Sequence, residues 1–166
     1  MITKSYEEQL FDLLTRDRLS IATAESCTGG LVSHRITTIP GSSAYFLGGV
    51  VAYSNAVKMS LLSVPEDILA RVGAVSAECA LAMAQGVRTR IGTDIGVSTT
   101  GIAGPGGATP TKPVGLVYVA CSTPWGDHVE EHRFTGNRIE TIRASAEAAL
   151  ACVIDQFTRR DGSSNS

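Results

Sequence analysis

The sequence has few of the features that mark metal-binding or disulfide-rich proteins. No Cys-x-x-Cys pair is present, and the four cysteines lie far apart in the chain: Cys27, Cys79, Cys121 and Cys152. Structural zinc sites and disulfide frameworks are built from closely spaced or numerous cysteines. We therefore expect neither, and a reducing cytoplasm is the natural setting for such a chain.

The sequence also lacks the signs of membrane and nucleic-acid binding. No apolar run reaches the roughly 18 residues that a membrane-spanning helix needs. The start, "MITKSYEEQLFDLL", is acidic and amphipathic, unlike a signal peptide. There are 14 Lys and Arg residues against 16 Asp and Glu, so the basic surplus expected of a nucleic-acid-binding protein is missing. We expect a cytoplasmic protein that binds neither membrane nor nucleic acid.

What is present is the composition of a globular domain. The chain has 166 residues, of which 43% are hydrophobic and 18% are charged. This length and composition suit one compact domain with its own core. We assign residues 1–160 to that domain and expect a disordered tail over 161–166, "DGSSNS". A symmetric homo-oligomer is the default expectation for the quaternary state.

Hydrophobic patterns predict helices that alternate with strands in the first part of the chain. An apolar stripe indicates a helix over residues 4–17, and "LSIATA" follows it as a short buried strand. Ser63 and Glu66 have the spacing of a capping box, which predicts that a further helix starts there. The other elements expected in this part are helices over 28–38, 55–64 and 76–90 and strands over 48–54 and 94–101.

The last third of the sequence predicts a hairpin and a long helix. Strands over 115–123 and 127–135 are joined at "PWGD", and the second has polar residues on both faces, as an edge strand would. Gly136-Asn137 leads into the final helix. Together these patterns predict an α/β fold, a three-layer α/β/α sandwich with a mixed, mostly parallel sheet of about five strands.

The stretch "TAESCTGG", residues 23–30, stands between a predicted strand and a predicted helix. Such turns at the carboxyl ends of strands are where α/β proteins place ligands. Ser26, Cys27 and Thr28 are each a possible nucleophile, and the following glycines let backbone amides approach an anion. The competing interpretation is that Ser26 or Thr28 only caps the helix.

A second stretch, "YSNAVK", follows the next predicted strand, so Tyr53 should reach the same sheet edge as Ser26. Ser54 and Lys58 are four residues apart, on one helix face. A lysine with a lowered pKa can act as the base for a serine nucleophile. The alternative is that Lys58 is a surface lysine and Tyr53 an ordinary strand aromatic.

The remaining candidates are charged residues near the C-terminus. Arg138 and Arg143 could hold a phosphate or carboxylate through paired hydrogen bonds, or could simply be solvated. His128 and His132 share a strand face with Glu130 and could bind a metal, although a solvated face is the favoured interpretation. P-loop, GxGxxG and GxSxG motifs are absent from the sequence. We expect no metal and no cofactor.

Read together, several stretches resemble one known family. They are "TAESCTGG", "GSSAYFLGGVVAYSNAVK", "GAVS", "TTGIAGPGG…KPVG" and "FTGNR". This set is similar to the C-terminal domain of the competence/damage-inducible CinA proteins, over roughly residues 5–158. Stand-alone members of that family are nicotinamide-nucleotide amidohydrolases. Longer members carry a further N-terminal domain, and this chain looks like the stand-alone form.

The resemblance implies an activity and a set of catalytic residues. The reaction is the deamidation of nicotinamide mononucleotide (NMN) to nicotinic acid mononucleotide and ammonia, in pyridine-nucleotide recycling. The family's serine, tyrosine and lysine match Ser26, Tyr53 and Lys58, and its "GNR" arginine matches Arg138. The implied fold is a three-layer sandwich.

We hypothesise that Ser26 attacks the carboxamide, that Lys58 takes its proton, and that Tyr53 orients Lys58 or relays the proton. Backbone amides of the turn would form the oxyanion hole, and other residues would bind the small nucleotide substrate. The residues expected in these binding roles are Thr28, Gly29, Gly30, Ser42, Thr100, Gly101, Arg138 and Arg143. Two alternatives remain open: a non-catalytic nucleotide- or partner-binding module, and a hydrolase for another amide.

Overall fold

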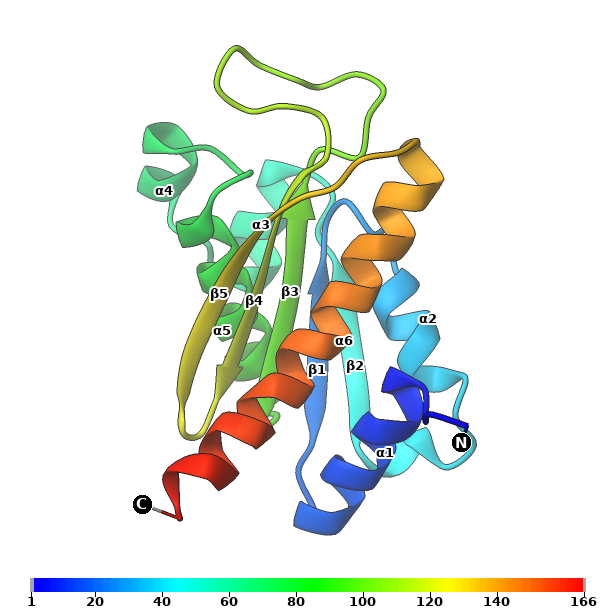
Figure 1. Cartoon of the computed structure of the whole chain (residues 1–166). Coiled ribbons are helices and arrows are strands. Elements are labelled where there is room, and N and C mark those ends of the chain that lie inside the picture. Colours follow the sequence, from blue (N-terminus) through cyan, green and yellow to red (C-terminus); the bar gives the residue numbers. More distant parts are fainter. Residues whose placement is uncertain (1, 166) are drawn as a thin grey trace.

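The computed structural model describes residues 2–165, so Met1 and Ser166, the outer ends of the predicted domain and tail, lie outside it. A five-stranded mixed sheet lies between two layers of helices (Figure 1). Its strands are β1 (Ile21–Glu25), β2 (Phe46–Val51), β3 (Ile95–Gly101), β4 (Leu116–Thr123) and β5 (Gly126–Arg133). The strand order is β2-β1-β3-β4-β5, with β1 parallel to both of its neighbours and β4 antiparallel to both of its own. This confirms the predicted fold class.

The helices divide between the two faces of the sheet (Figure 1). One face is covered by α1 (Tyr6–Asp17), α2 (Leu31–Thr37) and α6 (Arg138–Ser163), which pack on one another. The other is covered by α3 (Asn55–Leu62), α4 (Glu66–Arg71) and α5 (Ala77–Ile91). A 3₁₀ turn, η1 (Ser42–Ala44), lies just before β2 and contacts α2. Each face has its own apolar core. No helix within residues 2–165 is both long and apolar enough to cross a membrane.

Local sequence explains where most of these elements begin and end. Ser5 and Glu8 form a capping box at the start of α1. Ser76 caps α5 by accepting from the Cys79 amide, and Gly92 ends that helix in the left-handed conformation. Every residue of β1 is buried, as expected for a central strand covered on both faces. No residue of the edge strand β5 is fully buried, which agrees with the predicted edge position.

The capping box predicted at Ser63 and Glu66 is wrong. Ser63 ends α3 with a left-handed φ of 55°, and its amide donates to carbonyls of that helix. The N-cap of α4 is Pro65, which has no side-chain hydrogen bond. Because Ser63 already terminates one helix, its side chain does not reach the next.

The predicted tail also begins too early, because α6 continues to Ser163. Its last turns are held against the rest of the molecule by Arg160. That guanidinium donates to Asp17 of α1 at 2.7 Å and lies 4.7 Å over the Trp125 ring. These long-range contacts stabilise helix where the local composition predicts disorder.

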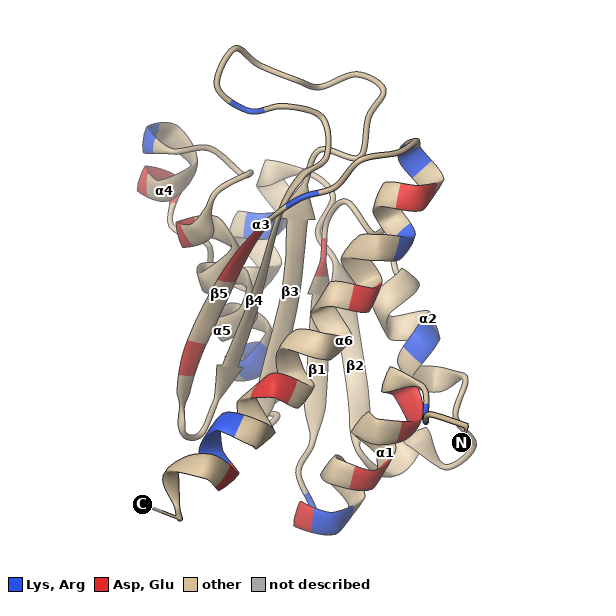
Figure 2. Cartoon of the chain, viewed as in Figure 1, with Lys and Arg blue, Asp and Glu red and all other residues tan. Residues whose placement is uncertain are grey.

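The topology creates a crevice at one edge of the sheet. The connection that leaves β1 runs through α2 on one face, whereas the connection that leaves β2 runs through α3, α4 and α5 on the other (Figure 1). At such a switch point the carboxyl ends of the strands are left open, and open α/β sheets bind ligands there. Lys and Arg are interspersed with Asp and Glu along the helices around the sheet (Figure 2).

Candidate active site

A tight turn at the end of β1 presents Ser26 at this crevice. The Ser26 amide donates to Thr99 O on β3 at 3.0 Å, which extends the β1–β3 pairing by one residue. The Gly29 amide then donates to Ser26 O at 3.1 Å and closes the turn. Gly29 and Gly30 have φ values of 59° and 110°, a region that favours glycine. The chain thus passes directly from β1 into α2.

Lys58 reaches Ser26 from the first turns of α3. Ser54 caps this helix by accepting from the Val57 amide at 3.2 Å. One turn later, Lys58 Nζ lies 3.0 Å from Ser26 Oγ and donates to Ala52 O at 2.8 Å. Only 1% of Lys58 is exposed, so it is not the surface lysine of the alternative interpretation.

The surroundings of Lys58 favour its neutral form. Burial lowers its pKa from the ordinary value of 10.5, because removal from water penalises the charged amine. Within residues 2–165 no carboxylate forms an ion pair with it. A neutral amine within hydrogen-bonding distance of a serine hydroxyl can take its proton.

The nearby carboxylate of Glu25 has a different role, which the sequence reasoning missed. It is 1% exposed and accepts from the amides of Gly30, Val32 and Ser33 at 3.2, 2.8 and 3.0 Å. It also accepts from the hydroxyls of Thr28 and Ser33, at 2.6 and 2.7 Å. Glu25 therefore caps α2 from inside the protein, where the helix dipole favours a negative charge. The only signal in the sequence was an acid just before the turn.

Two of the three backbone amides predicted for the oxyanion hole, those of Gly29 and Gly30, are taken up by hydrogen bonds within the protein. The Gly29 amide is bonded to Ser26 O and the Gly30 amide to Glu25. The Thr28 hydroxyl contacts both Glu25 and Thr99, and the residue is buried beneath the turn. None of these three residues lines the pocket that opens beside Ser26.

A pocket of about 280 Å³ opens beside Ser26. Its walls come from the turn after β1, the start of α3 with the residues before it, the segment before α5, the end of β3, the loop over residues 102–107 and the start of α6. The polar side chains on it belong to Ser26, Tyr53, Asn55, Lys58, Thr100 and Arg138. Thr100 donates to Ala74 O at 2.8 Å and so ties β3 to the segment before α5. Asn55 is a lining residue that the sequence reasoning did not name.

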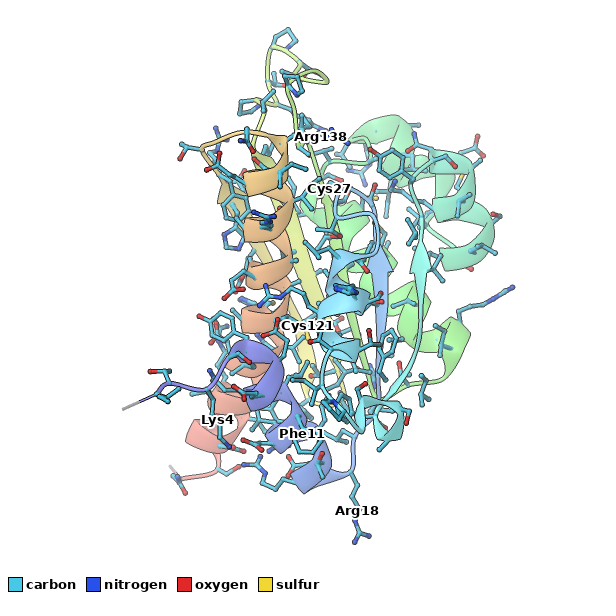
Figure 3. All side chains as sticks on the ribbon, turned by 90° about the vertical axis from the view of Figure 1, so that its right-hand side faces the viewer. Lys4, Phe11, Arg18, Cys27, Cys121 and Arg138 are labelled. Atoms are coloured by element: carbon cyan, nitrogen blue, oxygen red, sulfur yellow. The ribbon has the colours of Figure 1, made fainter. Side chains whose placement is uncertain are left out.

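Arg138 and Tyr53 meet at the mouth of the pocket. Arg138 Nη2 donates to the Tyr53 hydroxyl at 3.1 Å, and Nη1 donates to Gly104 O at 2.8 Å. Tyr53 is 60% exposed. Its hydroxyl therefore has Arg138 as its partner, and not Lys58 as predicted. Figure 3 shows Arg138 and Cys27, the neighbour of Ser26, at the same end of the molecule.

Two predicted binding residues lie elsewhere. Ser42 is in η1, before β2, and the start of β2 pairs with the start of β1, so Ser42 is at the opposite sheet edge from Ser26. Arg143 is exposed on α6, five residues after Arg138. Five residues turn a helix by about 140° beyond a full turn, which carries Arg143 away from the face that holds Arg138.

The histidines of β5 form a polar ladder around a carboxylate. Glu130 lies 3.2 Å from His128 Nε2 and 3.1 Å from His132 Nε2, and all three side chains are partly buried. Among residues 2–165 there is no group of three or more potential ligands that could hold a metal ion.

Comparison with known proteins places this site in a family. The profile of the CinA C-terminal domain matches residues 3–157. The chain is 50% identical over 137 residues to a CinA-like protein of Desulfotalea psychrophila, covering 82% of this chain and 33% of that protein. It is 52% identical over 138 residues to a putative competence-damage inducible protein of Moorella thermoacetica, covering 83% of this chain and 33% of that protein. The chain therefore spans about a third of the length of these curated relatives.

Solved structures agree with the sequence comparison. The crystal structure of the competence/damage inducible protein CihA from Agrobacterium tumefaciens superposes with a TM-score of 0.88 at 39% identity, covering 93% of this chain and 97% of that one. A CinA superfamily protein from Escherichia coli gives 0.87 at 30% identity, covering 90% and 87%. Matching motifs, sequence and fold together show that this chain belongs to the CinA C-terminal domain family.

Proposed function

We propose that this chain hydrolyses the carboxamide of NMN to give nicotinic acid mononucleotide and ammonia. The observation that carries the proposal is the contact of Lys58 Nζ with Ser26 Oγ at 3.0 Å, made by a lysine that is buried and has no acidic partner among the described residues. Serine–lysine pairs of this kind serve acyl transfer, in which an amide carbonyl is attacked by an activated hydroxyl.

In the first half of the reaction, neutral Lys58 takes the Ser26 proton as Oγ bonds to the carboxamide carbon. The carbon–nitrogen bond of the tetrahedral intermediate then breaks. The resulting ammonium of Lys58 returns its proton to the departing nitrogen, which leaves as ammonia. The product of this half is a nicotinoyl ester on Ser26 and a neutral lysine, so protons and electron pairs balance.

In the second half, water takes the place of the serine hydroxyl. Lys58 accepts a proton from the water as the water oxygen attacks the ester carbon, and then delivers a proton to Ser26 Oγ as the ester breaks. The hydrogen bond from Lys58 to Ala52 O, at 2.8 Å, holds the amine in place through both halves. The carboxylic acid that forms releases its proton to solvent and leaves as the carboxylate.

The charged end of the nucleotide would lie toward Arg138. Its guanidinium stands at the pocket mouth, held by Gly104 O and the Tyr53 hydroxyl. Arginine binds phosphate through two parallel hydrogen bonds, and the Tyr53 hydroxyl can act as a further donor. This arrangement supports a substrate that carries both an amide and an anionic group.

Ammonia release should be measured with NMN, nicotinamide and glutamine side by side. We expect release from NMN, and a loss of on the order of a thousandfold or more in Ser26→Ala with substrate binding retained. Ser43→Ala, an exposed serine at the other end of β2, is the matched control and should react like the parent chain. Release from glutamine alone would point to another amide, and release from none of the three would favour a non-catalytic binding module.

A further inference from the structure

We propose that the backbone amides of Cys27 and Gly101 form the oxyanion hole for the tetrahedral intermediate on Ser26. The inference rests on the proposed acyl transfer, which needs such donors and for which the predicted Gly29 and Gly30 amides are already bonded within the protein. Both Cys27 and Gly101 line the same pocket as Ser26.

The Cys27 amide is placed by the turn that follows β1. The bond from the Gly29 amide to Ser26 O makes Cys27 the first central residue of that turn. Within residues 2–165 its amide donates to no oxygen atom. The amide of the residue after a serine nucleophile is also one of the two oxyanion donors in the nucleophile elbow of other hydrolases, because it moves with the nucleophile.

The Gly101 amide is placed by strand alternation. The Ile102 amide donates to Leu116 O at 2.9 Å and Ile102 O accepts from the Gly115 amide at 2.8 Å, so the backbone groups of Ile102 face β4. Backbone groups of neighbouring residues in a strand point to opposite edges. Those of Gly101 consequently face the side of β1.

On that side β1 has already ended. The last bond of the pairing runs from the Ser26 amide to Thr99 O, two residues before Gly101. Continued pairing would use Ser26 O as the acceptor for the Gly101 amide, but Ser26 O accepts from Gly29 instead. The turn that presents the nucleophile therefore leaves the Gly101 N–H without an acceptor within the described chain, directed at the space beside Ser26.

Close packing keeps this donor rigid. A Cβ atom on residue 101 would lie 2.6 Å from both Leu116 O and the Val117 side chain. Strand β4 therefore packs against the backbone of Gly101 at a distance that only glycine allows. A donor fixed by a paired strand needs no reorganisation as negative charge develops on the carbonyl oxygen, which is what makes an oxyanion hole effective.

The test replaces the Gly101 N–H by an ester oxygen, leaving every side chain in place. Native chemical ligation at Cys79 and Cys121 allows the segment between them to be synthesised with this single change. We expect kcat for NMN to fall about a hundredfold or more with little change in KM, and Tm to stay at the parental value. The control is the same replacement at Ile95, at the other end of β3, which removes the bond of its amide to Ser20 O: Tm should fall by about 2–4 °C and kcat should stay within a fewfold.

A second readout separates this inference from the proposed substrate. A fluorophosphonate reacts with an activated serine by forming an O–P bond and expelling fluoride, while the hydroxyl proton passes to Lys58. Its phosphoryl oxygen uses the same donors. If the ester at 101 slows the labelling of Ser26 about a hundredfold or more, the assignment holds, even if the parent chain proves inert toward NMN. Labelling and turnover within threefold of the parent in the 101 ester would overturn it. A parent chain whose Ser26 reacts with neither reagent would overturn both proposals.

Discussion

Replacing Lys58 with methionine separates the chemical role of the lysine from its structural role. Methionine has a similar length and an unbranched, flexible side chain, so it fits the slot that leaves Lys58 only 1% exposed. The change removes the base next to Ser26 and the donor to Ala52 O. We expect kcat/KM for NMN to fall by about 10²–10⁴-fold, the usual contribution of a positioned general base.

Two opposing terms set the stability of Lys58→Met. The buried Ala52 carbonyl loses its donor, at a cost of about 1–3 kcal/mol. Against this, the variant avoids the free-energy cost of burying an ionisable amine away from water, which stabilises its folded state. The second term depends on pH, because every tenfold change in the proton affinity of the lysine between the unfolded and folded states corresponds to about 1.4 kcal/mol.

The sign of the pH dependence follows from the lowered pKa of Lys58. Above the unfolded value of about 10.5 the amine is neutral in both states and contributes nothing. As the pH falls below that value, the unfolded chain takes up a proton that the folded chain does not, so the free energy of unfolding of the parent decreases. The decrease levels off below the folded pKa. Lys58→Met lacks this titration and should therefore gain stability relative to the parent as the pH falls from 10 to 6.

Urea unfolding at pH 6, 8 and 10, with the pH profile of kcat/KM, tests this reasoning. The kcat/KM of the parent should rise with pH and reach a plateau, and the apparent pKa of this rise should lie below 10.5. Lys4→Met is the matched control: the contact with Asp12 raises the pKa of Lys4, so turnover and the pH trend should both follow the parent between pH 6 and 10. A stability difference for Lys58→Met that does not change with pH, or a variant that retains turnover, would refute the assignment of Lys58 as a neutral base.

Three further predictions follow from the site. Arg138→Met should raise KM for NMN at least tenfold while changing KM for nicotinamide riboside little, because the guanidinium is expected to bind the phosphate that only NMN carries. Glu25→Gln should lower the free energy of unfolding by about 2–4 kcal/mol in urea melts, since a neutral amide cannot accept from all five donors around that carboxylate; an unchanged midpoint would contradict its role as the cap of α2. Cys27, whose pKa burial raises to about 12, should resist iodoacetamide at pH 8 in the native protein and react once unfolded, as mass spectrometry can measure.

Much of the fold follows from local sequence, because hydrophobic periodicity is a property of the chain itself. The order of helices and strands and the late hairpin are found as predicted. Capping is less predictable. Ser76 caps the helix that was expected to begin there, whereas Ser63 has the spacing of a cap but ends the preceding helix. Which of two helix ends a serine belongs to depends on the path of the chain in space.

Part of the site follows from sheet topology, which the sequence also indicates. Ser26 is the first residue after β1 and Tyr53 the second after β2, and parallel neighbours end at the same edge of a sheet. The same rule argues against Ser42, because this residue precedes β2 and lies at the other edge. Arg138 lies far along the chain, and the structure nevertheless places it against Tyr53 at 3.1 Å.

By itself, the sequence determined the α/β class, the family and the two stretches that carry Ser26 and Lys58, since all of these are encoded in residue types and short spacings. Only the tertiary structure decided what each polar group in those stretches is bonded to. Glu25 caps α2 and consumes the Gly30 amide, Gly29 closes the turn, and Gly101 is left with its amide facing the pocket. The physical reason is that buried donors and acceptors take their partners from strands and helices far apart in the chain, and those pairings decide which amides stay open to the pocket.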